Sequence, residues 1–387
     1  MNKKEFAFSY KPIASVQALA RTLCEYFKNK PPFIVTEKQL HHYASDTSRY
    51  YSVFKKSPLK EDGSTRITYT IKKDFKKILK RIQVAILDEI VLPDYVVGGV
   101  KGASAITNAQ THASPLLLQA EDITNFFPSI SIHQVKRVFQ HCCHFPPEVS
   151  QLLAKLCTYN GFLAQGSPTS GHLANLVFFF IEPKVVAWLK ERGLTYSRLY
   201  DDVSISSKEH NFHKEIFQIR AVLYNMFDSV GVKKNSKKRK VMSSLERVEI
   251  HKMTANTNKL SPSKKRVSNV RIEVFSFEKL VKNKSDLEII ISKYRSIKGK
   301  ISNIKQQGCR HWQKHQTLLD KVLGGVDEQE AKKFFRKFRK IKNRKTYNGL
   351  RLQVAVLKKI NPALSKIADL EAKMALLKLK NNEAEKL

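Results

Sequence analysis

Residues 196–206 read Tyr-Ser-Arg-Leu-Tyr-Asp-Asp-Val-Ser-Ile-Ser, with two adjacent carboxylates between two strand-like runs. The alternation on either side predicts a β-hairpin with Asp201 and Asp202 at its tip. Neighbouring side chains on a strand point to opposite faces, so a tight turn is needed to aim Asp201 at a site shared with Asp202. An isolated Asp-Asp pair in a turn is more often structural than functional, so its meaning depends on acids elsewhere in the chain.

A second acidic segment, residues 119–130, reads Gln-Ala-Glu-Asp-Ile-Thr-Asn-Phe-Phe-Pro-Ser-Ile. Asp122 closes an apolar strand, and the chain then turns at a pair of phenylalanines. Three carboxylates brought together would repel one another unless divalent cations neutralised them. In-line nucleotidyl transfer uses two such ions, one to activate the attacking hydroxyl and one to hold the triphosphate. Asp122, Asp201 and Asp202 together therefore predict a two-metal site for Mg²⁺, with Mn²⁺ as the other candidate ion.

The chain is strongly basic: its 387 residues include 70 Lys and Arg against 34 Asp and Glu, a formal charge of +36. A hydrophobic content of 42% supports a packed interior and excludes a disordered chain. So large a positive charge favours a polyanionic partner, with nucleic acid first and a membrane surface second. No stretch approaches the roughly 18 apolar residues of a spanning helix. The five cysteines show no Cys-x-x-Cys spacing, which predicts an intracellular, cytoplasmic protein with reduced thiols.

A loop of small residues lies between the two acidic segments. Residues 163–171 read Leu-Ala-Gln-Gly-Ser-Pro-Thr-Ser-Gly and open an apolar helix. A loop of this kind lets a base pair approach the backbone closely, although Gln-Gly-Ser-Pro taken alone is a common turn. Strand-like and helix-like runs alternate from residue 116 to 206, which predicts a mixed α+β unit.

The composition changes beyond about Ser276 to helical periodicity with dense Lys and Arg. Residues 332–345 hold nine basic residues in fourteen, interleaved with Phe334, Phe335 and Phe338. The three phenylalanines give this segment a buried side, so we expect a basic helix whose other face contacts a phosphate backbone. The residues expected to bind RNA are Lys332, Lys333, Arg336, Lys337, Arg339 and Lys340. Near the end, Ile367, Leu370, Met374 and Leu377 form an apolar stripe that we expect to pack onto the rest of this helical region.

The order and wording of these motifs resemble reverse transcriptases with the right-hand polymerase fold, and specifically the bacterial retron-type group. The resemblance runs from about Tyr50 to about Arg271. The matching segments are Asp122 with Phe126-Phe127, Gln165-Gly166-x-Pro-Thr-Ser with Asn175, Tyr200-Asp201-Asp202, Gly231 through Asn235 to Lys238, the fingers segment from Lys60 to Ile67, and the Asn-Ala-x-x-His element from Asn108 to His112.

The resemblance implies metal ligands and a selective pocket. Asp122, Asp201, Asp202 and the backbone carbonyl of Ile123 would hold the two metal ions. Phe127 stands where the family places its steric gate, a ring that occupies the space a ribose 2′-hydroxyl needs, so dNTPs would be preferred.

The resemblance also implies a role for several residues around the nucleotide. Arg66 and Lys60 would clamp the phosphates, because cations offset charge that accumulates on the leaving pyrophosphate. Gln165 and Gly166 would border the templating base pair. Lys238 would donate a proton to pyrophosphate.

Asn108 and His112 have two interpretations. The resemblance suggests that they bind a family-specific RNA. The alternative is that they are buried hydrogen-bonding residues of the loop before the first palm strand.

The implied fold has three parts. Residues 1–115, with parts of 131–165, would form N-terminal helices and fingers, 116–275 the palm, and 276–387 a helical basic thumb. The implied function is RNA-directed DNA synthesis from a bound noncoding RNA, in bacterial antiphage defence. The partners would be the noncoding RNA, the RNA–DNA duplex, dNTPs, and an effector or toxin protein or further copies of the chain, without a membrane.

Three positions depart from the family's pattern. Leu199 occupies the usual tyrosine position of Tyr-x-Asp-Asp, Gly171 stands where proline is expected, and Met253-Thr254-Ala255 replaces the Val-Thr-Gly of retron enzymes. Two alternatives therefore stay open. One is a related defence-associated enzyme with template-independent or protein-primed DNA synthesis, and the other is a catalytically degenerate RNA-binding scaffold.

Overall fold

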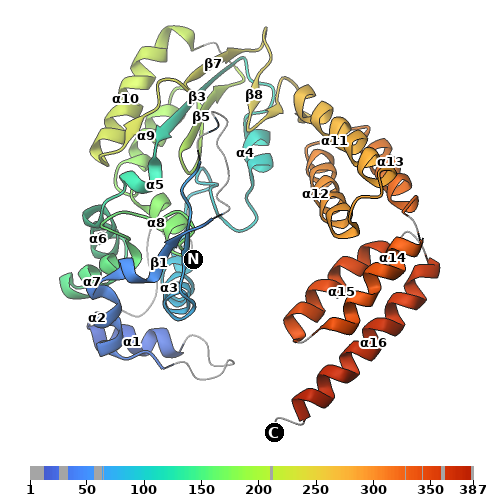
Figure 1. Cartoon of the computed structure of the whole chain (residues 1–387). Coiled ribbons are helices and arrows are strands. Elements are labelled where there is room, and N and C mark those ends of the chain that lie inside the picture. Colours follow the sequence, from blue (N-terminus) through green and yellow to red (C-terminus); the bar gives the residue numbers. More distant parts are fainter. Residues whose placement is uncertain are drawn as a thin grey trace. The chain divides into compact units, whose positions relative to one another are not determined.

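The computed structural model describes residues 13–25, 34–55, 63, 65–209, 212–326, 328–341, 343–358 and 362–384. The chain divides into two compact units. The first comprises Met1–His251 with Ala255–Asn258, and the second Lys252–Thr254 with Lys259–Leu387. In Figure 1 the first unit runs from blue to yellow and the second from yellow to red. Strands and helices alternate in the first unit and helices dominate the second, as the α+β prediction requires.

The centre of the first unit is a five-stranded sheet with β3 (Leu117–Thr124) in the middle. On one side β3 pairs antiparallel with β5 (Asp202–Ser207), which pairs in turn with β4 (Thr195–Leu199). On the other side β3 pairs with β6 (Lys233–Lys234) and β7 (Lys240–Ser243). The register sets Asp122 directly opposite Asp202. The predicted hairpin of residues 196–206 is therefore confirmed as β4 and β5.

Helices cover this sheet because the strands are apolar on their faces. Leu117, Leu118 and Ile123 of β3 are buried. Helix α10 (Ile216–Ser229) buries residues spaced three and four apart, among them Ile219 and Leu223, which is the pattern of an amphipathic helix on a core. It lies beside α9 (Glu182–Lys190), which contacts β4 (Figure 1).

The N-terminal part of this unit is helical, as the sequence predicts. A buried face repeats every three or four residues in α3 (Lys73–Ala85), formed by Phe75, Ile78, Leu79 and Ile82. The helix is followed by a 3₁₀ turn, η2 (Leu87–Glu89). The neighbouring elements are α1 (Val16–Glu25), α2 (Glu37–Ser45), η1 (Thr47–Tyr50), α4 (Ala105–Thr111), α5 (Phe126–Ser129), α6 (Ile132–His141), α7 (Pro147–Cys157), α8 (Ser170–Leu176), η3 (His213–Glu215), and the strands β1 (Tyr51–Val53), β2 (Tyr69–Ile71) and β8 (Glu249–Ile250).

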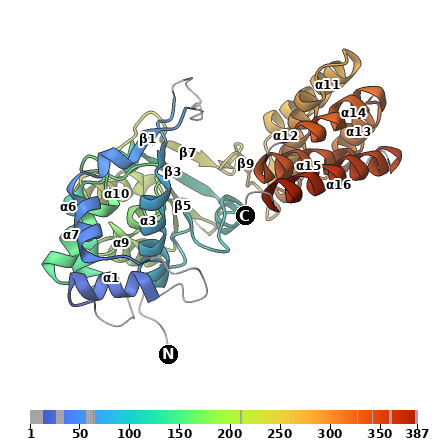
Figure 2. The same ribbon diagram turned by 60° about the horizontal axis from the view of Figure 1, so that its bottom comes forward.

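The second unit has its own apolar core, which is built from helices. After the short strands β9 (Met253–Thr254) and β10 (Ser261–Pro262), its elements are α11 (Lys264–Lys282), α12 (Leu287–Gln306), α13 (Trp312–Gly324), α14 (Glu328–Phe335), η4 (Arg336–Lys340), α15 (Arg344–Lys358) and α16 (Pro362–Ala384). Figure 2 shows these helices in the second view. The predicted palm boundary at residue 275 falls inside α11, and the functional division into fingers, palm and thumb stays a prediction.

The apolar stripe near the C-terminus does not pack as expected. Leu370, Met374 and Leu377 are exposed, and of the four residues only Ile367 is partly buried against the core. The buried face of α16 is instead formed by small residues with one leucine, namely Ala368, Ala372, Ala375 and Leu379. Alanine lets the backbone of α16 approach its neighbours closely, so the core takes the small residues and leaves the larger ones outside.

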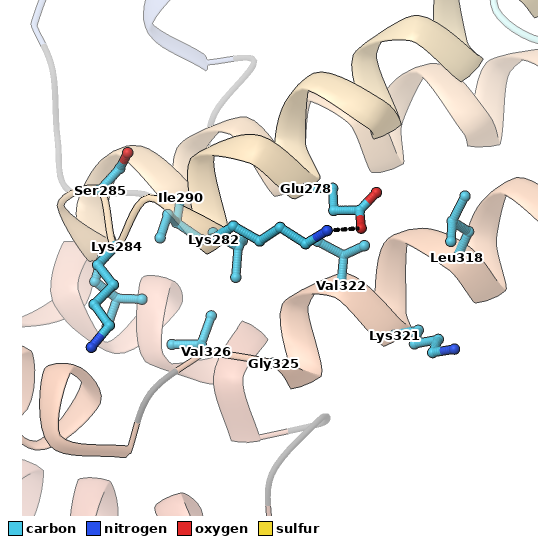
Figure 3. A pocket seen from close by; sticks show the side chains of 12 residues that line it. Glu278, Lys282, Lys284, Ser285, Ile290, Leu318, Lys321, Val322, Gly325 and Val326 are labelled. Carbon is cyan, nitrogen blue, oxygen red and sulfur yellow. Dashed lines mark ion pairs between the residues drawn. The ribbon is translucent and has the colours of Figure 1, made fainter.

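A pocket of about 410 Å³ lies among α11, α12 and α13 in the second unit (Figure 3). Lys284 and Lys321 line it together with apolar side chains such as Val322, and Lys282 reaches towards Glu278, with which it forms an ion pair of 2.8 Å. No residue expected to take part in catalysis lines this pocket. Over the described residues, none of the helices has the length and apolar content needed to cross a bilayer.

Candidate active site

Three acidic residues lie near the end of β3 and the start of β5. Asp122 and Asp202 are cross-strand partners, and Asp201 lies in the turn between β4 and β5. Tyr200 supplies the tight turn with a left-handed backbone, φ +57°. The N–H of Ile123 donates to the carbonyl of Asp201 at 3.0 Å, which ties the turn to β3. The structure therefore brings together three residues that are up to 80 positions apart in the sequence.

Both carboxylate oxygens of Asp122 accept hydrogen bonds from the segment after β6. Asn235 Nδ2 donates to Oδ1 at 2.8 Å and Lys238 Nζ donates to Oδ2 at 3.0 Å. The Asn235 N–H also donates to the Asp122 carbonyl at 2.7 Å. Partial burial lowers the pKa of Lys238, but the hydrogen bond and charge of Asp122 raise it more, so the net pKa is raised. Lys238 therefore carries its proton at neutral pH beside Asp122.

The two carboxylates of the turn hold their protons unusually tightly. Burial, and then the charge of Asp122, raises the pKa of Asp201. Burial, followed by repulsion from Asp201 and Asp122, raises the pKa of Asp202 to about 7, although 49% of its side chain is exposed. The positive charges of Lys238 and Arg66 act in the opposite direction and lower both pKa values. The positive charges of Lys238 and Arg66 therefore do not fully offset the burial and mutual repulsion of these carboxylates.

The donor set fits a divalent cation such as Mg²⁺, which prefers carboxylate oxygens and would relieve the repulsion that raises these pKa values. Within the described ranges, no three His, Cys, Asp or Glu side chains are close enough together to form a complete metal site. Asp122 is already engaged by Lys238 and Asn235. Each Asp122 oxygen keeps a further lone pair, so a bound ion would share the carboxylate with Lys238 and Asn235.

The pH dependence of this site has a definite sign. Because the pKa of Asp202 is raised, a metal ion must displace a proton at low pH and meets a free carboxylate at high pH. We expect the Mg²⁺ affinity of the full chain to increase between pH 6 and pH 8, measured by calorimetric titration. An Asp202→Asn variant should show a weaker pH dependence. An affinity that is equal at both pH values in the wild-type chain would contradict this account.

Phe127 lies next to the acidic turn. Asn125 takes a left-handed backbone, φ +46°, and starts the short helix α5, which carries both phenylalanines. Phe126 is buried and stacks on Phe178 with ring centroids 5.9 Å apart. Phe127 is half-buried, and its ring centroid is 5.7 Å from that of Tyr200. One phenylalanine therefore anchors the helix, and the other faces the residue that precedes Asp201.

The 165–166 loop holds the β-hairpin that carries Arg66. The N–H of Tyr69 in β2 donates to the carbonyl of Gln165 at 2.8 Å. Gly166 has φ +102°, and a Cβ atom there would overlap the Tyr69 carbonyl, so only glycine fits. Arg66 is exposed, and its charge lowers the pKa of Asp201 and Asp202, so it lies on the same side of the unit as the acids. Lys60, the second predicted phosphate ligand, lies outside the described residues.

Asn108 and His112 are fully buried. Both ring nitrogens of His112 are hydrogen-bonded inside the protein, Nδ1 to Ser206 Oγ and Nε2 to Ser197 Oγ, each at 2.7 Å. Burial, and then the charges of His251 and Lys208, lowers the pKa of His112 to about 4, so the ring is neutral. Neither side chain has surface with which to contact RNA in this structure. Their placement matches the alternative of buried hydrogen-bonding residues.

A residue that the sequence motifs did not indicate links Asn108 to the acidic turn. Asn108 Nδ2 lies 2.7 Å from His251 Nε2, and His251 Nδ1 lies 3.8 Å from Asp202 Oδ2. His251 has a left-handed backbone, φ +48°. No spacing rule joins positions 108, 202 and 251, so only the fold could reveal this contact.

A buried ion pair beneath the turn was also missed. Arg198 and Glu182 are both fully buried, with Arg198 Nε–Glu182 Oε1 at 2.6 Å and Nη2–Oε2 at 2.8 Å. The Tyr196 hydroxyl donates a hydrogen bond to Glu182 Oε1 at 2.7 Å. Arg198 Nη1 donates to the carbonyl of Tyr200 at 3.3 Å. The pair therefore supports the backbone immediately before Asp201.

The basic residues expected to bind RNA lie in the second unit. Lys332, Lys333, Arg336, Lys337, Arg339 and Lys340 are all exposed, and Phe334, Phe335 and Phe338 are buried, as predicted. Part of this charge is neutralised within the unit: Arg339 Nε donates to Glu371 Oε2 at 2.9 Å, and Lys337 Nζ lies 3.2 Å from Glu288 Oε2. RNA binding by this surface stays a prediction.

Several known proteins are similar in sequence to this chain. No protein-family model matches the chain. The retron Se72 reverse transcriptase of Salmonella heidelberg is 32% identical over 238 residues, 62% of this chain and 59% of that protein. The chain is similar to retron reverse transcriptases. The retron Ec48 enzyme of Escherichia coli is 27% identical over 63% of each chain, and the retron Ec86 enzyme of the same species is 27% identical over 62% of this chain and 73% of its own.

The match covers about three fifths of the length of the retron Se72 and Ec48 reverse transcriptases. Among solved structures, telomerase from Candida albicans in complex with a fragment of telomeric RNA aligns with 87% of this chain and 69% of its own. That alignment has 11% identity and a TM-score of 0.37, too low to establish a shared fold. The similarity to retron reverse transcriptases therefore rests on sequence.

Proposed function

We propose that the chain is an RNA-directed DNA polymerase that copies a bound noncoding RNA into DNA. The observation that carries this proposal is the register of β3 and β5, which sets Asp122 opposite Asp202 with Asp201 in the adjoining turn. Sequence similarity to retron reverse transcriptases supports the same chemistry. The right-hand arrangement, with fingers in 1–115, palm in 116–275 and thumb in 276–387, is part of the proposal.

The proposed ion ligands are Asp122, Asp201, Asp202 and the carbonyl of Ile123. When bound, two Mg²⁺ ions, or Mn²⁺ in their place, would activate the attacking hydroxyl and neutralise the triphosphate. The protein's own cations add to this. Lys238, which holds a proton at Nζ 3.0 Å from Asp122, is the proposed proton donor to pyrophosphate.

The remaining residues of the site orient and select the nucleotide. Arg66 lies close enough to lower the pKa of Asp201 and Asp202, which suits a role in holding the phosphates, and Lys60 is proposed beside it. Gln165 and Gly166, pinned to β2 through Tyr69, would border the templating base pair. The basic residues 332–340 would follow the backbone of the RNA–DNA duplex.

A template-primer assay tests the proposal directly. A short RNA annealed to a DNA primer should be extended by the purified chain with dNTPs and Mg²⁺. Chelation of the metal by EDTA should stop extension, and added Mg²⁺ should restore it. Failure to extend the primer with either Mg²⁺ or Mn²⁺ would contradict the proposal.

Phe127→Ala should relax selection against ribonucleotides, because removing the ring opens space for a 2′-hydroxyl. The discrimination gained from one such steric contact is about 10- to 100-fold. We expect kcat/KM for rNTPs to rise relative to dNTPs by about this factor in the same extension assay. Phe162→Ala, which removes a half-buried ring from another loop, is the control and should leave the ratio unchanged. An unchanged ratio in Phe127→Ala would show that this ring is not the gate.

Two observations favour a second candidate, a catalytically degenerate RNA-binding scaffold. Both Asp122 oxygens are engaged by protein donors, and Leu199 replaces the usual tyrosine of the family's motif. In this case the chain would bind RNA and synthesise no DNA. Antiphage defence in a bacterial cytoplasm and an effector partner are further parts of the proposal. Protein-primed or untemplated DNA synthesis is an alternative to it, and the nucleic acid bound in cells would distinguish the two.

A further inference from the structure

Tyr200 has no role in the chemistry described above, yet its side chain is closely surrounded by glycines. It precedes Asp201 in the turn, its backbone is left-handed, and its ring is half-buried. A residue with positive φ is usually glycine or asparagine, so an aromatic residue here is unusual. The large ring must be accommodated by its neighbours.

Three glycines from two separate segments provide that space. A Cβ atom at Gly98 would lie 2.7 Å from the Tyr200 nitrogen and 2.9 Å from its Cγ, and one at Gly99 would overlap the Tyr200 hydroxyl. A Cβ atom at Gly171 would lie 3.0 Å from the same hydroxyl. Gly98, Gly99 and Gly171 thus form a cradle around the ring that any side chain would fill. Gly171 is also the position where the sequence departs from the proline of related enzymes.

Hydrogen bonds from Asn175 and Arg198 hold both the cradle and the turn. Asn175 Nδ2 donates to the carbonyl of Gly98 at 2.6 Å. Arg198 Nη1 donates both to Asn175 Oδ1 and to the carbonyl of Tyr200, each at 3.3 Å. The Gly98 side and the Tyr200 side of the contact are therefore held by one buried network.

The Tyr200 ring also contacts Phe127. The two ring centroids are 5.7 Å apart with an interplanar angle of 52°, within the range of favourable aromatic pairs. Phe126, the first residue of the same short helix, stacks on Phe178. Phe127 thus has two aromatic neighbours, Phe126 and Tyr200, and the Tyr200 ring is enclosed by the glycine cradle.

We propose that Tyr200 is a positioning residue for the sugar gate: its ring, held by Gly98, Gly99 and Gly171, supports Phe127 and so sets how strongly the site rejects ribonucleotides. This inference rests on the proposed polymerase function. It also explains why residue 171 is glycine, because a larger side chain there would displace the Tyr200 ring.

The first test compares Tyr200→Ala with Tyr200→Phe in the full chain. kcat/KM is measured for a dNTP and the matching rNTP on an RNA template with a DNA primer. We expect Tyr200→Phe, which keeps the ring, to retain the wild-type ratio. Tyr200→Ala removes the support of Phe127 and should lower the dNTP preference by about threefold to tenfold. A ratio that stays constant while both rates fall equally would indicate a purely structural role and overturn the inference.

The second test examines the cradle itself. Gly171→Ala places a methyl group against the Tyr200 hydroxyl, and this should change the dNTP-to-rNTP ratio. Removal of the hydroxyl leaves the nearest ring atoms 3.6 Å from that methyl group, an ordinary contact. Gly171→Ala combined with Tyr200→Phe should therefore return the ratio to the wild-type value.

The outcomes separate the inference from the function on which it rests. If Gly171→Ala has no effect, or if Tyr200→Phe does not reverse its effect, the cradle does not position the gate. A wild-type chain that selects dNTPs while Tyr200→Ala retains the full preference overturns the inference alone. A wild-type chain that adds no nucleotide overturns the proposed function, and the inference with it.

Discussion

Replacement of Asp201 by Asn is expected to abolish nucleotide addition, with a loss of at least about 1,000-fold in kcat, or roughly 4 kcal/mol of transition-state stabilisation. Asp201 lies in the turn tied to β3 by the Ile123 N–H. An amide keeps nearly the same shape and can fill the same space. It lacks the negative charge that a divalent ion requires, so the fold should persist while the chemistry is lost.

The measurement is extension of a DNA primer on an RNA template at saturating dNTP and Mg²⁺. Asp228→Asn is the matched control, because Asp228 is exposed near the end of α10 and belongs to no predicted site. It should extend the primer at the wild-type rate. Thermal unfolding of both variants should resemble that of the wild-type chain. Wild-type extension by Asp201→Asn would refute the assignment of this carboxylate.

The second large effect concerns stability. Glu182→Gln removes the negative charge that compensates fully buried Arg198, while Gln keeps a similar volume. Breaking a buried pair by removing one charge costs about 3–5 kcal/mol, because the remaining charge is left in a low-dielectric interior. We expect the free energy of unfolding of the first unit to fall by about this amount. Asn175 and Tyr196, which share the network, cannot compensate because neither is ionised with a negative charge at neutral pH.

Chemical denaturation followed by circular dichroism measures this change. The control is Asp46→Asn, which removes an exposed ion pair with Arg49 of the kind that contributes little to stability. Its unfolding midpoint should stay at the wild-type value. Equal midpoints for Glu182→Gln and wild type would mean that the pair is not buried as described.

The sequence was most informative where a pattern is local. Alternation on both sides of Asp201 and Asp202 predicted the hairpin, and an apolar run ending at Asp122 predicted the strand beside it. The phenylalanines among the basic residues predicted the buried face formed by Phe334, Phe335 and Phe338. Each of these signals depends on residues that are close together in the sequence. The periodicity of apolar residues is therefore enough to predict the element.

Long-range contacts carry no such signal. Glu182 is 16 positions from Arg198, and His251 is 49 positions from Asp202, so neither partnership follows from spacing. The choice of a buried face also failed in α16, where alanines pack inward and Leu370, Met374 and Leu377 face outward. Close helix packing selected small side chains there, and hydrophobicity alone could not predict that selection.

The position of a residue within a motif also proved a weak guide to its exposure. Asn108 and His112 match an element of the retron type, yet both are buried and hydrogen-bonded. Tyr200, by contrast, was noted only as part of the matching segment Tyr200-Asp201-Asp202. The fold gives it a glycine cradle that no sequence rule indicated.

The measurement that tests the central claim most directly is the identity of the nucleic acid that copurifies with the chain. The wild-type and Asp201→Asn chains would be purified from cells that carry the flanking locus, and the bound material treated with RNase, DNase or proteinase before sequencing. The proposal predicts one discrete RNA joined or paired to complementary DNA in the wild type, and RNA without DNA in Asp201→Asn. RNA without DNA in both would contradict it and favour the scaffold. DNA with no complementary RNA, or DNA attached to protein, would also contradict it and would point to untemplated or protein-primed synthesis.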